Sequence, residues 1–234
     1  MTRRIIVTGA GRGIGLGIAK QLIAEGHEVW GTARHPENAK ELRDAGAAGV
    51  LTLDIGDVDS IQAFGVDLAT HVDSIDTLIN NAGMTSAALG VDRRAQGPLQ
   101  TTKEVVMRQI EVNAVGPMLV TQAVRPLLGS GVGPVVLNIS SQLGSMVVGA
   151  QMPSDVGYNS SKSVMNMVTV MSATADPDVT YVAIHPGWVQ SDMGGPKAAL
   201  SIDESSQGIV SALNTLGPTD TGRFIKIDGN DHPW

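Results

Sequence analysis

The chain has 234 residues, 42% of them hydrophobic and 17% charged, which is too apolar a composition for a disordered protein. A net charge of −7, with basic clusters no larger than the pairs Arg3-Arg4 and Arg93-Arg94, argues against nucleic-acid binding, and the absence of cysteine excludes disulfides and thiolate metal sites. No apolar run is long enough for a membrane span or a secretory signal, so we expect a cytoplasmic protein with neither a membrane partner nor a metal centre.

Short hydrophobic runs alternate with segments of helical periodicity along the chain. The predicted strands are 4–8, 28–32, 49–53, 77–80, 134–140, 180–185 and 223–227. The predicted helices are 14–24, 38–45, 58–70, 103–115, 158–173 and 204–213, with Asp57 as an N-cap and Gly26 after a helix end. Strands without polar alternation belong to sheets covered on both faces. The pattern predicts one doubly wound α/β domain over 1–234, with a seven-stranded, mostly parallel sheet.

A glycine-rich turn joins the first predicted strand to the first predicted helix. Glycines let the backbone approach a pyrophosphate, and the helix N-terminus offers free N–H groups to it. The spacing is not G-x-G-x-x-G but T-G-x-x-x-G-I-G, and a tight strand-to-helix connection remains an alternative interpretation. The candidate cofactor residues in this turn are Thr8, Gly9, Arg12, Gly13, Ile14 and Gly15.

The end of the second predicted strand favours NADP(H) over NAD(H). NAD sites often carry a carboxylate there, whereas this strand leads into Arg34, whose planar fork suits a 2′-phosphate. Arg12 in the glycine turn is a second cation near the same place. Either arginine taken alone is more often just a solvated surface charge, and it is the two together that favour NADP(H).

Tyr158 and Lys162 are four residues apart at the start of a predicted helix and share one of its faces. A nearby cation stabilises a phenolate, so we expect Lys162 to lower the pKa of Tyr158 and make it a proton donor or acceptor. Of the two tyrosines in the chain, Tyr181 is in mid-strand without such a partner. Tyr158 as an aromatic packed on a loop is the alternative.

Polar residues also follow two predicted strands, where ligands of parallel sheets bind. Ser140 and Ser141 end the fifth strand, and Asn80 and Asn81 end the fourth. A hydroxyl there suits a substrate oxygen, although Ser140 is equally explained as a cap. The chain has no G-x-S-x-G elbow, which argues against a serine hydrolase.

Together these motifs resemble the short-chain dehydrogenase/reductases, a family with the Rossmann fold. The matching segments are TGAGRGIG at 8–15, Asp54 after the third strand, NNAG at 80–83, VNAVGP around Asn113, NISS at 138–141, YNSSK at 158–162 and HPGWVQS at 185–191. They extend nearly end to end. The segments SSQLGS, HPGWVQSDMGG and the final TGRFIKIDGNDHPW resemble more particularly its C-factor and sniffer-like carbonyl reductase branch.

The resemblance implies a role for each matching residue. Tyr158 would be the general acid for carbonyl reduction, Lys162 would lower its pKa and bind the nicotinamide ribose, and Ser141 would hydrogen-bond the carbonyl. Asn113 would anchor a water that links Lys162 to solvent. The other cofactor contacts would be Asp54 and Ile55 at the adenine, Asn81, Ala82 and Gly83 along the channel, and Pro186, Gly187, Val189 and Ser191 at the carboxamide.

The position of the serine is a departure from the family pattern. Ser141 precedes Tyr158 by 17 residues, whereas the commonest family spacing of 13 would select Ser145. The NISS strand end favours Ser141, and the C-factor-like branch has a longer loop here. Ser145 is the alternative.

Three loops, 84–100, 142–157 and 188–203, are expected to surround the substrate. Their apolar residues suit a hydrophobic carbonyl compound, although the same residues could simply pack the loops. The candidate substrate residues are Leu143, Met146, Val147, Val148, Met152, Trp188 and Met193. The helix from Tyr158 is apolar nearly all round, which predicts a second subunit on its outer face, in a homodimer or homotetramer.

The sequence thus predicts an NADP(H)-dependent oxidoreductase that reduces an apolar ketone, aldehyde or quinone, or runs the reverse reaction. The alternative is a cofactor-binding signalling or regulatory protein of the same fold with little turnover. The complete set of Asn113, Ser141, Tyr158 and Lys162 favours the enzyme, because a pure binding protein has no need of the phenol.

Overall fold

The computed structural model describes residues 2–129 and 133–234. Seven strands form one sheet in the order β3-β2-β1-β4-β5-β6-β7, and every neighbouring pair is parallel. The strands are β1 (Arg4–Val7), β2 (Glu28–Ala33), β3 (Gly49–Thr52), β4 (Thr77–Asn80), β5 (Val135–Ile139), β6 (Thr180–His185) and β7 (Phe224–Lys226). The predicted seven-stranded, doubly wound sheet is confirmed.

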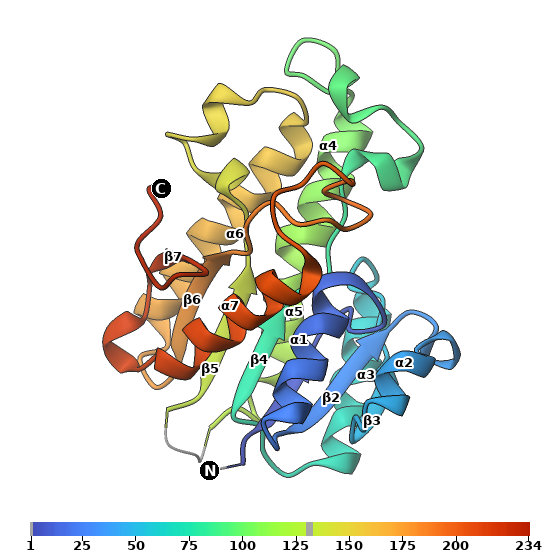
Figure 1. The fold of residues 1–234 in the computed structure, drawn as a ribbon, viewed down its shortest axis with the longest axis vertical. Coiled ribbons are helices and arrows are strands. Elements are labelled where there is room, and N and C mark those ends of the chain that lie inside the picture. Colours follow the sequence, from blue (N-terminus) through green and yellow to red (C-terminus); the bar gives the residue numbers. More distant parts are fainter. Residues whose placement is uncertain (1, 130–132) are drawn as a thin grey trace.

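Helices cover both faces of this sheet (Figure 1). They are α1 (Gly13–Ala24), α2 (Lys40–Asp44), α3 (Val58–His71), α4 (Lys103–Ile110), α5 (Gly116–Val124), α6 (Val156–Ala175) and α7 (Ile202–Thr215). One apolar core joins α1 and α7 to the sheet through side chains such as Leu22 and Leu213. A second core, on the other face, contains Phe64 of α3 and Val124 of α5. Within the described residues, no helix combines the length and the apolar character needed to cross a bilayer.

Local signals account for several helix ends. The Asp57 carboxylate accepts a hydrogen bond from the Asp59 N–H and caps α3, and Gly26 follows α1 with a φ of +84°, both as predicted. The helix from Tyr158 begins earlier than expected, at Val156, because the Asp155 carboxylate caps it.

The helix predicted over 103–115 is longer than the sequence indicated. It is α4, a π-helical turn over Glu111–Val115, and then α5, which the sequence analysis missed. Glycine and proline usually interrupt a helix, but here Gly116 and Pro117 lie within one and allow it to pack closely. A Cβ at Gly116 would overlap the Ile55 carbonyl oxygen, and the wider π-helical turn falls where Pro117 has no N–H to donate.

The strand order reverses between β1 and β4, which lie side by side at the centre of the sheet. Ligands of doubly wound sheets bind in the crevice at the carboxyl ends of such strands. The glycine turn follows β1 and the NNAG segment follows β4, so the topology brings both motifs to one edge.

Candidate active site

The glycine turn after β1 has the backbone that its sequence requires. Gly9 and Gly13 have φ angles of +65° and +58°, which other residues rarely adopt. A Cβ at Gly15 would overlap the Asn81 amide nitrogen and lie 2.5 Å from the Gly9 carbonyl oxygen. Arg12 is the N-cap of α1 and gives it no side-chain hydrogen bond. The first turn of α1 therefore offers its N–H groups to an anion, a fit for a pyrophosphate.

Thr8 and Asn81 connect this turn to the end of β4. The buried Thr8 hydroxyl oxygen accepts hydrogen bonds from the N–H groups of Asn81 and Ala82, at 3.0 and 3.1 Å. The Asn81 amide in turn donates to the Thr8 carbonyl oxygen at 2.9 Å. These reciprocal bonds give the crevice floor one rigid arrangement.

The residues expected at the adenosine end follow β2 and β3, at the same edge of the sheet as the glycine turn. Arg34 is exposed just after β2. Asp54 follows β3, its carboxylate accepts a hydrogen bond from the Gly56 N–H at 2.9 Å, and Ile55 beside it is buried. Arg12, the other expected cation, forms an exposed ion pair with Asp192 of the 188–203 loop. An exposed pair of this kind is weak, so a phosphate could replace the carboxylate.

Asn113 lies in the π-helical turn between α4 and α5, fully buried. Its side-chain amide exchanges two hydrogen bonds with the backbone of Met84, at 2.7 and 2.8 Å, and donates a third to the Ser161 hydroxyl. A Cβ at Gly83 would lie 3.0 Å from the Asn113 side-chain oxygen Oδ1 and 3.9 Å from Lys162 Nζ. Asn113 thus joins the loop after β4 to helix α6.

Tyr158, Lys162 and Ser141 meet above the carboxyl end of β5. The Lys162 ammonium lies 5.8 Å from the centroid of the Tyr158 ring and donates a hydrogen bond to the Ile139 carbonyl oxygen at 2.8 Å. Burial lowers the pKa of Lys162 to about 8. The Ser141 hydroxyl lies close enough to the Tyr158 phenol to favour its phenolate form. The three groups that the sequence analysis selected for acid–base chemistry are therefore neighbours.

The expected direction of the Tyr158 pKa shift is wrong. Burial raises the pKa of the phenol, and the neighbouring Ser141 hydroxyl and the positive charge of Arg93 offset only part of this rise. Sequence reasoning counted the lysine one helical turn away, but it could not count the desolvation of the ring, which disfavours the phenolate.

The neighbouring serines have other partners. The Ser140 hydroxyl donates to the Asn166 side-chain oxygen at 2.6 Å, and the buried Ser145 hydroxyl donates to the Trp234 carbonyl oxygen at 3.1 Å. Ser145 therefore connects the loop after β5 to the final residues of the chain rather than to Tyr158.

Arg93 and Asp155 are neighbours of Tyr158 that the sequence analysis missed. The Arg93 guanidinium carbon lies 5.8 Å from the ring centroid, and its Nε lies 3.3 Å from the Asp155 carboxylate. Asp155 is completely buried and also accepts hydrogen bonds from Ser86 and Gln109. The available signals were an Asp three residues before Tyr158, typical of an N-cap, and the Arg93-Arg94 pair.

The segment after β6 contains the last group of expected cofactor residues. Gly187 has a φ of +84° and Val189 is buried. The Pro186 carbonyl oxygen accepts a hydrogen bond from Ser205, and the Ser191 hydroxyl accepts one from the Gly194 N–H. These bonds hold the 188–203 loop in a compact shape.

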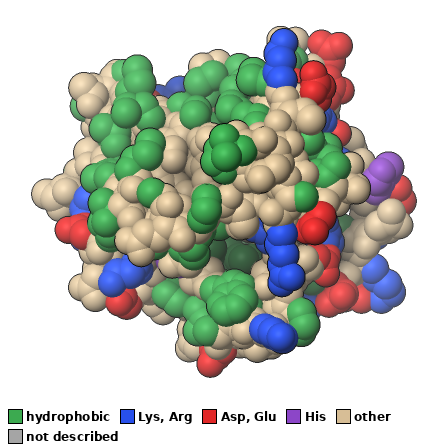
Figure 2. Space-filling model, turned by 90° about the horizontal axis from the view of Figure 1, so that it is seen from above, with side chains coloured by type: hydrophobic (Ala, Val, Ile, Leu, Met, Phe, Trp, Pro, Cys, Tyr) green, Lys and Arg blue, Asp and Glu red, His purple; other side chains and the backbone are tan. Residues whose placement is uncertain are grey.

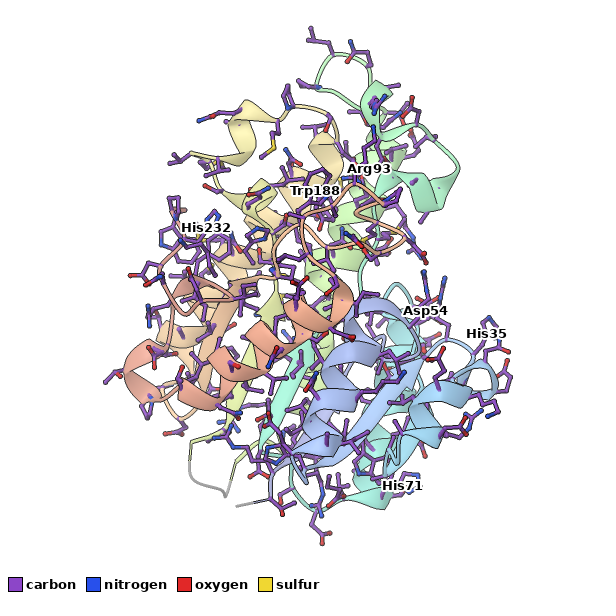
Figure 3. All side chains as sticks on the ribbon, viewed as in Figure 1. His35, Asp54, His71, Arg93, Trp188 and His232 are labelled. Atoms are coloured by element: carbon purple, nitrogen blue, oxygen red, sulfur yellow. The ribbon has the colours of Figure 1, made fainter. Side chains whose placement is uncertain are left out.

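The expected substrate residues differ in exposure. Leu143, Val148 and Met152 are half-buried, whereas Met146, Val147, Trp188 and Met193 are exposed. Figure 2 shows hydrophobic side chains around a hollow on the face seen from above, with basic side chains at its rim. Figure 3 labels Arg93 and Trp188, and Arg93 donates a hydrogen bond to the carbonyl oxygen of Met193, which belongs to the same loop as Trp188. The described ranges contain no group of three or more potential metal ligands.

Comparisons with known proteins agree with this architecture. A family model described as short chain dehydrogenase matches residues 3–200. The C-signal protein of Myxococcus xanthus is 35% identical over 178 residues, which cover 74% of this chain and 100% of that protein. Carbonyl reductase Sniffer of D. melanogaster has a TM-score of 0.89 at 28% identity, with both chains covered completely.

A carbonyl reductase from Pseudomonas aeruginosa PAO1, solved in complex with NADP, has a TM-score of 0.83 at 28% identity, again with 100% of both chains covered. The family match extends over most of the chain, and the similar structures share its complete fold. The chain therefore belongs to the short-chain dehydrogenase/reductase family of oxidoreductases, and it is of the carbonyl reductase and C-signal type.

Proposed function

We propose that the protein is an NADP(H)-dependent carbonyl reductase with Tyr158 as its general acid. The observation that carries this proposal is the convergence of Tyr158, Ser141 and Lys162 beside a glycine turn that fits a dinucleotide. The nicotinamide cofactor, when bound, supplies or accepts the hydride.

The protein's own part in the reaction is to orient the carbonyl and move a proton. Ser141 hydrogen-bonds the substrate oxygen, and Tyr158 donates its phenol proton to that oxygen as negative charge develops there. Burial raises the pKa of Tyr158, so the phenol stays protonated at neutral pH. That state favours reduction of a carbonyl, whereas oxidation of an alcohol needs the phenolate and therefore a higher pH.

Lys162 and Asn113 support this proton transfer. Lys162 is held below the ring by the Ile139 carbonyl oxygen, where it can bind the nicotinamide ribose. Asn113 is anchored by Met84 and Ser161, next to Gly83 and Lys162, where it can hold a water between the lysine and solvent. This arrangement supports the proton relay that the family resemblance implies.

We further propose that the cofactor is NADP(H). Arg34 and Arg12 are the cations at the adenosine end of the crevice, and a structural relative was solved with NADP. Dissociation constants for NADPH and NADH, measured by fluorescence, test this proposal. NADPH should bind at least about tenfold more tightly, and Arg34→Ala should remove most of that difference because it removes a phosphate contact. Equal affinity for both cofactors would refute the proposal.

The substrate we propose is an apolar ketone, aldehyde or quinone held by the loops 84–100, 142–157 and 188–203. The exposed apolar side chains of Met146, Trp188 and Met193 support this class. Oxidation of NADPH at 340 nm across a panel of such carbonyl compounds tests it, with Tyr158→Phe as the inactive control. The second candidate is a signalling protein with little turnover, which the similarity to C-signal favours. NADPH binding with no turnover of any compound would support that candidate.

We also propose a homo-oligomer. Met167 and Met171 on α6 are 60% and 63% exposed, as is Met107 on α4 at 53%, and α4 packs against α6. A second copy of the chain would cover this apolar surface. Light scattering at micromolar concentration should give a dimer or tetramer, and a monomer would refute the proposal.

A further inference from the structure

The geometry points to Arg93 as a positioning residue that ties the 188–203 loop to the N-terminus of α6 across the ring of Tyr158. This inference rests on the proposed function, because it assigns Arg93 to the same site. It goes beyond the Tyr158, Lys162 and Ser141 set, since Arg93 comes from a different loop.

Arg93 makes three contacts that no other residue combines among the described ranges. Its Nε lies 3.3 Å from the Asp155 carboxylate, its Nη1 donates to the Met193 carbonyl oxygen at 2.9 Å, and its guanidinium carbon is 5.8 Å from the centre of the Tyr158 ring. One side chain thus contacts the helix cap, the loop and the phenol ring.

The Asp155 end of this bridge is rigid. Asp155 is completely buried and accepts hydrogen bonds from the Tyr158 N–H, from Gln109 of α4 and from Ser86. A buried carboxylate needs such partners and a compensating cation, and Arg93 supplies the positive charge. The guanidinium is therefore fixed relative to α6.

The loop end of the bridge has few other attachments. Within the part of the chain that the structure describes, the hydrogen bonds that leave residues 188–200 are those of Asp192 with Arg12 and of Met193 with Arg93. The loop tip is thus held from the glycine turn on one side and from the Tyr158 side on the other. Loss of Arg93 frees the substrate side only.

The groups around the phenol define what Arg93 does there. Lys162 faces the ring from its own helix, Asp155 from the helix cap, Ser141 from the loop after β5, and Arg93 from the loop after β4. Arg93 favours the phenolate and Asp155 opposes it. Replacing Arg93 by a neutral residue leaves the carboxylate uncompensated, so the pKa of Tyr158 rises.

Two measurements that need no substrate test this inference. Hydrogen–deuterium exchange should be faster in residues 188–200 of Arg93→Gln than in the natural chain. The chain has only two tyrosines, so NMR of 13Cζ-labelled tyrosine, assigned with Tyr181→Phe, follows Tyr158 directly. The pKa of Tyr158 should rise by at least about half a unit in Arg93→Gln, and Arg93→Lys should restore part of the shift but not the slow exchange.

Matched variants separate the two effects. Asp192→Asn should speed exchange in the loop without moving the Tyr158 pKa, and Arg94→Gln should change neither, because Arg94 is an exposed neighbour outside the bridge. If Arg93→Gln does not fold, the double variant Arg93→Gln with Asp155→Asn removes both charges together and should still free the loop. Unchanged exchange in residues 188–200 of Arg93→Gln or of the double variant, or an unchanged Tyr158 titration in Arg93→Gln, would overturn the inference.

Kinetics link the result to the reaction. With an active carbonyl compound, Arg93→Gln should raise KM more than it lowers kcat at pH 7, and it should shift the alkaline limb of the oxidation profile to higher pH. Exchange and titration depend on neither turnover nor cofactor. A silent substrate panel would therefore count against the proposed function while these two measurements still decide the role of Arg93.

Discussion

The glycine turn allows a sharp test of how backbone crowding controls cofactor binding. Gly15→Ala would place a Cβ 2.5 Å from the Gly9 carbonyl oxygen, about 0.9 Å inside an ordinary contact of 3.4 Å, and would also overlap the Asn81 amide. The Asn81 side chain cannot simply turn away, because it is hydrogen-bonded to the Thr8 carbonyl oxygen at 2.9 Å. The backbone of the turn must therefore move.

The expected cost follows from three contributions. Overpacking costs roughly 1–3 kcal/mol, and loss of the Asn81 hydrogen bond costs about 1 kcal/mol. Alanine in a helix returns about 1 kcal/mol relative to glycine. The net destabilisation is about 2 kcal/mol, and because it falls on the turn itself, NADPH should bind at least about tenfold more weakly.

Gly11→Ala is the matched control in the same turn. Gly11 is not among the positive-φ glycines, and its Cβ would meet the Ala33 and Ala39 side chains at an ordinary 3.7 Å. The free energy of unfolding and the NADPH affinity should stay within about 0.5 kcal/mol of the natural chain, or rise slightly, because the unfolded chain loses freedom. Urea unfolding and fluorescence titration measure both quantities. Equal behaviour of the two variants would refute the reasoning.

Five further substitutions test other contacts of the site, two of them as matched controls. Thr8→Val should lower the free energy of unfolding by at least about 2 kcal/mol, because two backbone N–H groups lose their acceptor. The control Thr77→Val on β4 should leave the free energy of unfolding unchanged or raise it, because the buried Thr77 hydroxyl has no hydrogen-bond partner. Lys162→Met should stabilise the protein at pH 7 by up to about 3 kcal/mol, since burial lowers the lysine pKa from 10.5 to about 8. Between pH 8 and pH 10.5 the lysine is protonated in the unfolded chain but not in the folded one, so the natural chain gains stability as the pH rises through this range. The difference in free energy of unfolding between Lys162→Met and the natural chain, measured by denaturation, should therefore shrink over the same range. Ser141→Ala should reduce turnover at least about 100-fold. Ser145→Ala should keep its turnover but have a lower Tm, because it loses the hydrogen bond to the Trp234 carbonyl oxygen. The reverse result would assign the contact with the substrate carbonyl to Ser145.

Much of the fold was predictable because its signals are local. Uninterrupted apolar strands between helical segments indicated a parallel sheet, and Asp57 and Gly26 marked helix ends where they occur. Helix α5 was missed because Gly116 and Pro117 usually end a helix. Only contact with Ile55, more than sixty residues earlier in the chain, explains the glycine there.

The site also has features that the sequence predicted and features that it did not. The Tyr158 and Lys162 pair was predictable because residues four apart share a helix face, and the structure places Ser141 beside them. The place of Arg93 in the site was not predictable, because its partner Asp155 is 62 residues away and the sequence gives no distance between loops. The pKa direction of Tyr158 was wrong for a related reason, since burial depends on every segment packed around the ring.

The sequence by itself determined the doubly wound sheet, the glycine turn and the Tyr–Lys pair, because hydrophobic periodicity and helical spacing act between residues near one another in the chain. The tertiary structure alone decided which cation faces the phenol, which serine contacts it, and how far burial outweighs charge in setting its acidity. Those properties arise from desolvation and from contacts between distant loops, and both exist only once the chain has folded.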